Sequence, residues 1–214
     1  MKKLKTVFLL LLIIFVCCPS TAFAANVHKE APNVPAKIRN NFVSTGGTLN
    51  IVNSLPNGKP GTSSFHYSYT KRNGKVIKFQ YTTKISISKK AQNRKKTVAH
   101  ELGHFFDRCI STYNPISGKV AQYSKTNSTW LKFYKEQRSK YKPVLKNTGV
   151  DHIKSNSSEF FAQCCADYWL APGALKKLSK TRYNTMKKIT DNYLKSALNG
   201  QMMPTYDIVN QKLK

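Results

Sequence analysis

Acidic residues are scarce in this chain. Only 9 of its 214 residues are Asp or Glu, against 36 Lys or Arg, which gives a formal net charge of +27. The basic residues are spread through the whole chain, and a basic soluble surface is the simplest interpretation. A more specific alternative is that the positive charge attracts anionic partners, either acidic substrates or anionic cell-wall polymers. No zinc-finger, helix-turn-helix or RNP motif occurs, so we expect no nucleic-acid partner.

The chain also lacks a hydrophobic run long enough to span a bilayer. Its main apolar stretch, Val7 to Cys18, has 12 residues, and a transmembrane helix needs about 20. Three lysines precede this stretch, and Pro19 and the small-residue site Ala22-Phe23-Ala24 follow it. This order is typical of a secretory signal peptide. We therefore predict a signal peptide over residues 1–24 and a secreted, extracellular protein, with association to the cell wall as an option.

A retained lipid anchor on Cys17 or Cys18 is the alternative to cleavage after Ala24. Lipoprotein sites have small residues before the cysteine, whereas Phe15 and Val16 are bulky, so we expect no membrane anchor. Cleavage would remove three lysines and no acids, and the formal net charge would fall from +27 to +24. Residues 25–214 are enough for the core of one medium-sized domain.

Cysteine is too scarce for a disulfide framework. Three of the five cysteines lie beyond residue 24, namely Cys109, Cys164 and Cys165, and an odd number cannot be fully paired. In a secreted chain Cys109 could pair with one of the other two. Three buried thiols are the alternative.

The residues before the central motif predict a small sheet. The expected elements are a loose, proline-bearing lead-in over 25–35, a short helix over 36–42, strands over 48–52, 65–71, 75–81 and 84–88, and a loop over 53–64. The pair Asn73-Gly74 is typical of a tight hairpin turn. Residues 84–88 alternate polar and apolar side chains, which favours a strand with one solvated face.

The stretch His100-Glu101-Leu102-Gly103-His104 contains the H-E-x-x-H pattern. Histidines four residues apart lie on one side of an α-helix, so both imidazoles can reach one zinc ion while the Glu lies beside it. We predict a helix from about Arg94 to Cys109. On it, His100 and His104 would be zinc ligands and Glu101 a general base. The small residues Ala99 and Gly103 allow another element to approach closely.

A catalytic zinc requires a third protein ligand and one open position. The candidates downstream are Asp107, Glu136, Asp151, His152, Glu159 and Asp167. Asp107 lies one turn beyond His104, which suits a hydrogen bond behind a ligand better than ligation. Glu136 sits in a charged run. Glu159 begins a predicted helix over 158–170 with a small, partly polar face, so it is favoured, while Asp151, His152 and Asp167 stay open.

Two motifs together resemble a known family. His100 to Asp107, followed by Ser158-Glu159-Phe160-Phe161-Ala162, is similar to the catalytic domain of anthrax lethal factor and its secreted single-domain relatives, the Pro-Pro endopeptidases. The resemblance runs from about Lys84 to Ile189. It implies an α+β, zincin-like metallopeptidase domain, with a small mixed or antiparallel sheet, an active-site helix and a helical C-terminal half. It also implies that the strand over 84–88, just before the active-site helix, is a sheet edge to which a peptide substrate adds.

The resemblance also implies the roles of individual residues. His100, His104 and Glu159 would bind Zn²⁺, with a gluzincin-like glutamate as third ligand, and Glu101 would be the general base. His152 stands where the family has a tyrosine that binds the oxyanion, and Gln163 stands where it has a glutamate. His152 could replace the tyrosine as a catalytic donor, or it could be an exposed loop histidine.

The function expected from these residues is that of a secreted zinc endopeptidase acting on extracellular proteins or peptides. The resemblance suggests proline-rich surface proteins as substrates. The alternative is a catalytically weak or inactive zinc-binding basic protein retained on anionic cell-wall polymers, favoured by the charge and by the departures at His152 and Gln163. A toxin-like effector is a third interpretation that we rank below these two.

Overall fold

The computed structural model describes residues 27–113, 119–145, 150–197 and 203–204. The predicted signal peptide, including Cys17 and Cys18, lies outside these residues. Among the residues described, no helix is both long and apolar enough to cross a membrane.

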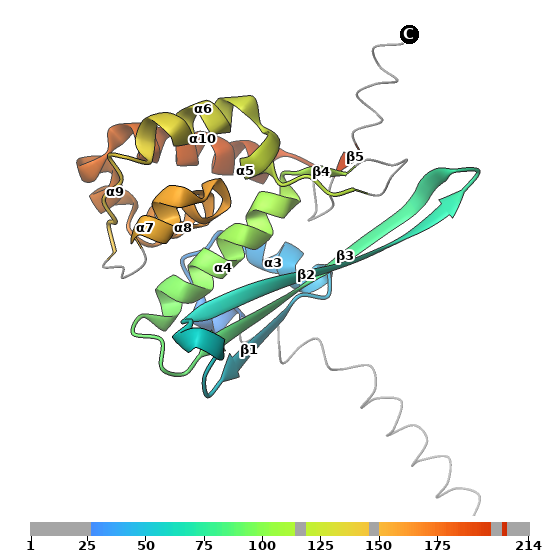
Figure 1. Cartoon of the computed structure of the whole chain (residues 1–214), viewed down its shortest axis with the longest axis horizontal. Coiled ribbons are helices and arrows are strands. Elements are labelled where there is room, and N and C mark those ends of the chain that lie inside the picture. Colours follow the sequence, from blue (N-terminus) through green and yellow to red (C-terminus); the bar gives the residue numbers. More distant parts are fainter. Residues whose placement is uncertain (1–26, 114–118, 146–149, 198–202, 205–214) are drawn as a thin grey trace, which may run out of the picture.

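The described chain is α+β, with a small sheet followed by a helical second half (Figure 1). The helices are α3 (Ala36–Ser44), α4 (Arg94–Cys109), α5 (Tyr123–Thr126), α6 (Ser128–Gln137), α7 (Val150–Ser155), α8 (Ser157–Leu170), α9 (Pro172–Leu178) and α10 (Lys180–Lys195). The main sheet contains β1 (Thr48–Val52), β2 (Gly61–Arg72) and β3 (Lys75–Ser88), and β4 (Thr112–Tyr113) pairs with β5 (Met203–Pro204). A 3₁₀ turn, η1, covers Pro56–Gly58.

The main sheet is mixed, with strand order β1-β3-β2. Strands β2 and β3 form the predicted antiparallel hairpin, and its far end projects away from the helices (Figure 1). Asn73 and Gly74 at its turn have positive φ angles of 50° and 75°, the left-handed backbone that this kind of turn requires at both positions. The short strand β1 pairs with β3 in parallel.

The prediction that residues 84–88 form a sheet edge is wrong. This segment is the end of the central strand β3, and it pairs with β1 on one side and with β2 on the other. In the described sheet the edge strand on the hairpin side is β2. That strand begins at Gly61, inside the segment predicted as a loop. The first residues of the strand are small and polar and have no strand pattern in the sequence, which explains the difference.

Helix α4 has the predicted bounds and lies between the sheet and α8 (Figure 1). Phe105 contacts Phe42 of α3 and Tyr81 of β3, with ring centroids 5.4 and 6.3 Å apart. The next residue, Phe106, contacts Phe161 of α8 at 5.9 Å. Neighbouring phenylalanines thus anchor opposite sides of the motif helix, which fixes its orientation.

Helices α4 and α8 approach each other closely at Gly103. A Cβ atom at this position would lie 2.8 Å from both the Cα and the carbonyl oxygen of Ala162. Only a residue without a side chain fits this contact. Of the two small residues predicted to permit a close approach, Gly103 does so.

The lead-in over residues 25–35 is not loose where it is described. Val27, Ala31 and Val34 belong to the hydrophobic core, each at most 1% exposed. Glu30 receives a hydrogen bond from Arg94 at the start of α4, with 2.8 Å between Nε and Oε2. The lead-in therefore packs on the domain and contacts the motif helix.

The three described cysteines are buried free thiols, so the proposed pairing of Cys109 is wrong and its alternative is confirmed. The Cys109 sulfur lies 3.4 Å from the Tyr81 hydroxyl, and burial raises the pKa of this thiol to about 12. These thiols pack as apolar side chains in the core.

Candidate metal centre

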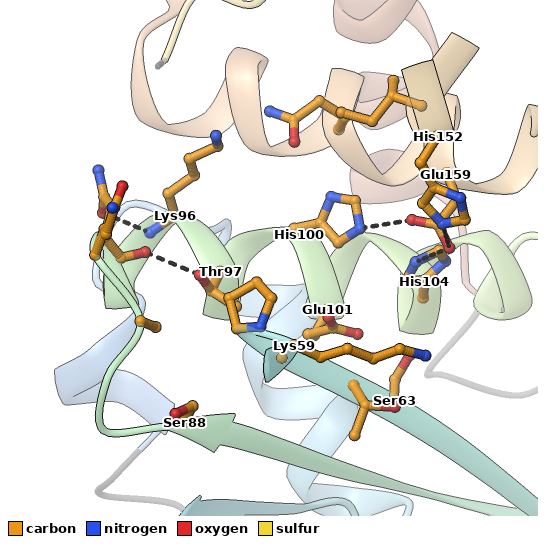
Figure 2. A pocket seen from close by; sticks show the side chains of 18 of the residues that line it. Lys59, Ser63, Ser88, Lys96, Thr97, His100, Glu101, His104, His152 and Glu159 are labelled. Atoms are coloured by element: carbon orange, nitrogen blue, oxygen red, sulfur yellow. Dashed lines mark hydrogen bonds and ion pairs between the residues drawn. The ribbon is translucent and has the colours of Figure 1, made fainter. Parts of the chain in front are cut away.

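Two helix starts position the predicted ligands. Asn93 caps α4 through its side chain, which accepts a hydrogen bond from Lys96 N, and the helix carries His100 and His104 one turn apart. Asn156 caps α8 in the same way, accepting from Ser158 N at 2.9 Å and Glu159 N at 3.4 Å. The cap sets the first turn of α8 and directs Glu159 toward α4 (Figure 2).

The side chains of His100, His104 and Glu159 converge on one point. His100 Nε2 lies 3.1 Å from Glu159 Oε2, and His104 Nε2 lies 3.3 Å from Glu159 Oε1. One ligand atom from each residue lies within 4.8 Å of the others, and this is the single cluster of its kind in the part of the chain that the structure describes.

This arrangement fits a zinc ion. Zinc–nitrogen and zinc–oxygen bonds of about 2.0–2.1 Å, at tetrahedral angles, separate two ligand atoms by about 3.3 Å. The two His–Glu separations, 3.1 and 3.3 Å, are close to that value, each measured to a different oxygen of Glu159. Two imidazoles and one carboxylate also match a catalytic zinc set, which leaves a fourth position for water. Ligation by these residues stays a prediction.

A buried polar chain supports His104 from behind. His104 Nδ1 lies 3.3 Å from Ser158 Oγ, and that hydroxyl donates to Asp107 Oδ2 at 3.3 Å. The fully buried Asp107 also accepts from Ser124 N and Oγ, at 2.8 and 2.7 Å. Because Ser158 donates to the carboxylate, its oxygen can accept a hydrogen bond from Nδ1–H of His104, and that tautomer leaves Nε2 available to a metal ion.

The titration properties of the cluster follow from its contacts. Burial raises the pKa of Glu159, but hydrogen bonds and charge from His100 and His104 outweigh it and hold the pKa well below its usual range. Burial lowers the pKa of His104, whereas Glu159, Glu101 and Asp107 raise it, and the net shift is upward. The carboxylate of Glu159 is therefore ionised at neutral pH, as a metal ligand must be.

Glu101 lies beside the cluster in a cleft of about 740 Å³. Glu101 is 6% exposed, and residues 58–63 also line the cleft. A Cβ atom at Gly61 would lie 2.9 Å from Glu101 Oε1. The start of the edge strand β2 therefore passes directly over the Glu101 carboxylate, as Figure 2 shows for neighbouring Lys59 and Ser63.

The structure brings His152 to the cleft and leaves the other candidates outside the cluster. His152 lies on α7 with a 67% exposed side chain, and its Nε2 is 3.7 Å from Glu159 Oε1. Glu136 and Asp151 are exposed, and neither belongs to the cluster.

Asp167 is fully buried and accepts a hydrogen bond from Gln163 Nε2 at 2.9 Å. An amide at position 163 can donate this bond, which a carboxylate could not.

Sequence reasoning missed several residues around the centre. Ser158 and Ser124 carried no signal, because their role depends on the packing of α5 and α8 against α4. Gly61 was hidden in a loop prediction. Lys96 could have been found, because it lies four residues before His100 and so on the same face of α4.

One comparison with known proteins gives a match. The family model described as anthrax toxin lethal factor, N- and C-terminal domain, matches residues 24–189. No curated protein and no solved structure matches the chain.

Proposed function

From the membership of this chain in the anthrax toxin lethal factor family, we propose that it is a secreted zinc endopeptidase with a zincin-like fold. The observation that carries the proposal is the convergence of His100, His104 and Glu159 in a cleft that also holds Glu101. Export after removal of residues 1–24 is part of the same proposal, since the start of the chain has the pattern of a signal peptide.

The residues of the cleft have distinct roles in this proposal. His100, His104 and Glu159 would hold the ion, and a bound zinc would polarise a water molecule and lower its pKa toward about 7. Glu101 takes the proton as the water attacks the scissile carbonyl, and then delivers it to the leaving amine. The buried position of Glu101, 6% exposed, keeps that proton from exchanging freely with bulk water.

The edge strand β2 is the element that would bind the peptide main chain. In the described sheet β2 pairs only with β3, so its other side is an edge, and its first residues line the cleft. A peptide can add to such an edge as a further strand. Because Gly61 has no side chain, the start of β2 lies close to Glu101, which would place a peptide on the edge of β2 near the general base.

Among the described residues, we assign the stabilisation of the oxyanion to His152. Its imidazole lies on the α7 side of the cleft, 3.7 Å from Glu159, and an imidazole N–H can donate a hydrogen bond to developing negative charge. The high exposure of His152 allows it to move toward a substrate. Proline-rich surface proteins are the first substrates to test.

The second candidate function is a zinc-binding, catalytically idle protein retained on anionic cell-wall polymers. The formal charge of +24 after residue 24 favours it. The two functions differ in one observable product, since only the peptidase releases peptide fragments.

The test is to incubate the protein, from residue 25 onward, with a peptide library that includes proline-rich sequences and to identify products by mass spectrometry. We expect cleavage that stops when a chelator removes the metal and returns when zinc is added, because the residues of the site act only around the ion. The matched control is the His104→Ala variant in the same library. No product from the wild type, or products that persist in the chelator, would reject the endopeptidase.

A further inference from the structure

Lysines outnumber acidic residues in the lining of the cleft. Three lysines line it, Lys59, Lys90 and Lys96, and the acids lining it are Glu101 and Glu159. In the proposed enzyme those two carboxylates offset the charge of one zinc ion. The lysine charges then determine the potential that a peptide meets on entering the cleft.

Lys96 differs from the other two lysines because it forms part of the floor of the cleft. It is 7% exposed, whereas Lys59 and Lys90 are exposed on the rim. Its Nζ lies 3.4 Å from the carbonyl oxygen of Leu145. Figure 2 shows Lys96 on the same helix as His100, with its ammonium directed toward the helices on the opposite wall.

The acid whose charge acts on Lys96 is shared with other groups. Asp167 raises the pKa of Lys96 against the lowering effect of burial, which is the larger of the two. The same carboxylate accepts hydrogen bonds from Gln163 and Tyr141 and lies 3.8 Å from Arg182 Nη1. The charge of Asp167 thus acts on both Lys96 and Arg182, and Asp167 itself does not line the cleft.

We propose that Lys96 is a specificity-determining residue that selects substrates with an acidic side chain near the scissile bond. This inference rests on the proposed function. Lys96 and His100 are one helical turn apart, about 6 Å along the axis, and the lysine chain extends farther. An extended peptide advances about 3.3 Å per residue, so the acid should lie about two or three residues from the cleaved bond.

The test compares matched peptides that carry Glu or Gln at each position within three residues of a bond that the enzyme cleaves. At one position we expect kcat/KM to be about tenfold higher for Glu, because the lysine ammonium bonds an ionised carboxylate more strongly than a neutral amide. The Lys96→Met variant should reduce this ratio to about one. Lys95→Met is the control, because it removes the same charge from the exposed neighbouring position on α4.

Binding gives a readout that does not depend on turnover. The Kd values of the same peptide pairs, measured by fluorescence anisotropy with the Glu101→Gln chain, should show the same preference for Glu. If the wild type cleaves peptides without preferring Glu at any position, or if Lys96→Met keeps the preference, Lys96 is not the selecting residue and the endopeptidase still stands. Absence of any cleavage would instead reject both the endopeptidase and the inference that rests on it.

Discussion

The Glu101→Gln variant is expected to lose about 10²–10⁴-fold in kcat/KM, the usual contribution of a positioned general base. Glutamine keeps the shape of the side chain and can still hydrogen-bond to water, but it cannot take up a proton. Because Glu101 is not one of the three converging ligands, the variant should keep its zinc. Peptide cleavage and metal content, measured on the same preparation, check both halves of the expectation.

Glu136→Gln is the matched control for this variant. Glu136 lies exposed on α6, so the same change of charge there should leave both kcat/KM and metal content unchanged. Full activity in the Glu101→Gln variant would contradict the assigned role of this residue. A variant that loses its zinc would show instead that Glu101 helps to hold the ion.

The Gly103→Ala variant is expected to be destabilised by about 1–3 kcal/mol, the usual cost of overpacking a tight interior contact. Its new methyl group would lie 2.8 Å from the main chain of Ala162, so α4 and α8 must move apart. Since His104 and Glu159 lie on these two helices, beside the contact, the movement should also weaken zinc binding. Urea unfolding and zinc titration measure the two effects.

Gly173→Ala provides the control, because a Cβ atom at Gly173 meets nothing within 4 Å. At this helical position alanine should be neutral or stabilising by up to about 1 kcal/mol. Equal effects of the two substitutions would mean that the close approach of α4 and α8 does not constrain position 103.

The sequence predicts local structure best where one strong local signal determines it. The bounds of α4 follow from apolar spacing around the H-E-x-x-H pattern, and the β2–β3 turn follows from Asn73-Gly74, whose backbone has the positive φ angles that this pair tolerates. The start of the Glu159 helix follows from the capping Asn156. In each case a few neighbouring residues determine the conformation.

Features that depend on distant pairing were missed. The alternation in residues 84–88 shows that one face differs from the other, but it does not reveal β1, about 36 positions earlier, as a partner. The burial of Val27, Ala31 and Val34 was also missed, although their spacing of four and three residues is that of a helix face. Two prolines in the lead-in concealed this pattern.

The candidate site likewise contains residues that the sequence alone identifies and residues that only the packing of distant elements reveals. Its two histidines are encoded within five consecutive residues, and the glutamate was favoured by its position at the head of an apolar helix. Ser158 and Asp107, which orient His104, and Gly61, which passes over Glu101, act through contacts between elements. Only the packing of α8 and β2 against α4 brings these residues together.

The most direct test of the account is the zinc content of the purified protein, from residue 25 onward, by elemental analysis after dialysis. We predict one zinc per chain in the wild type and in the exposed-site control Glu136→Ala, and almost none in Glu159→Ala, which removes the third ligand atom from the cluster. A wild-type protein free of zinc, or a Glu159→Ala variant that keeps the full complement, would contradict the account.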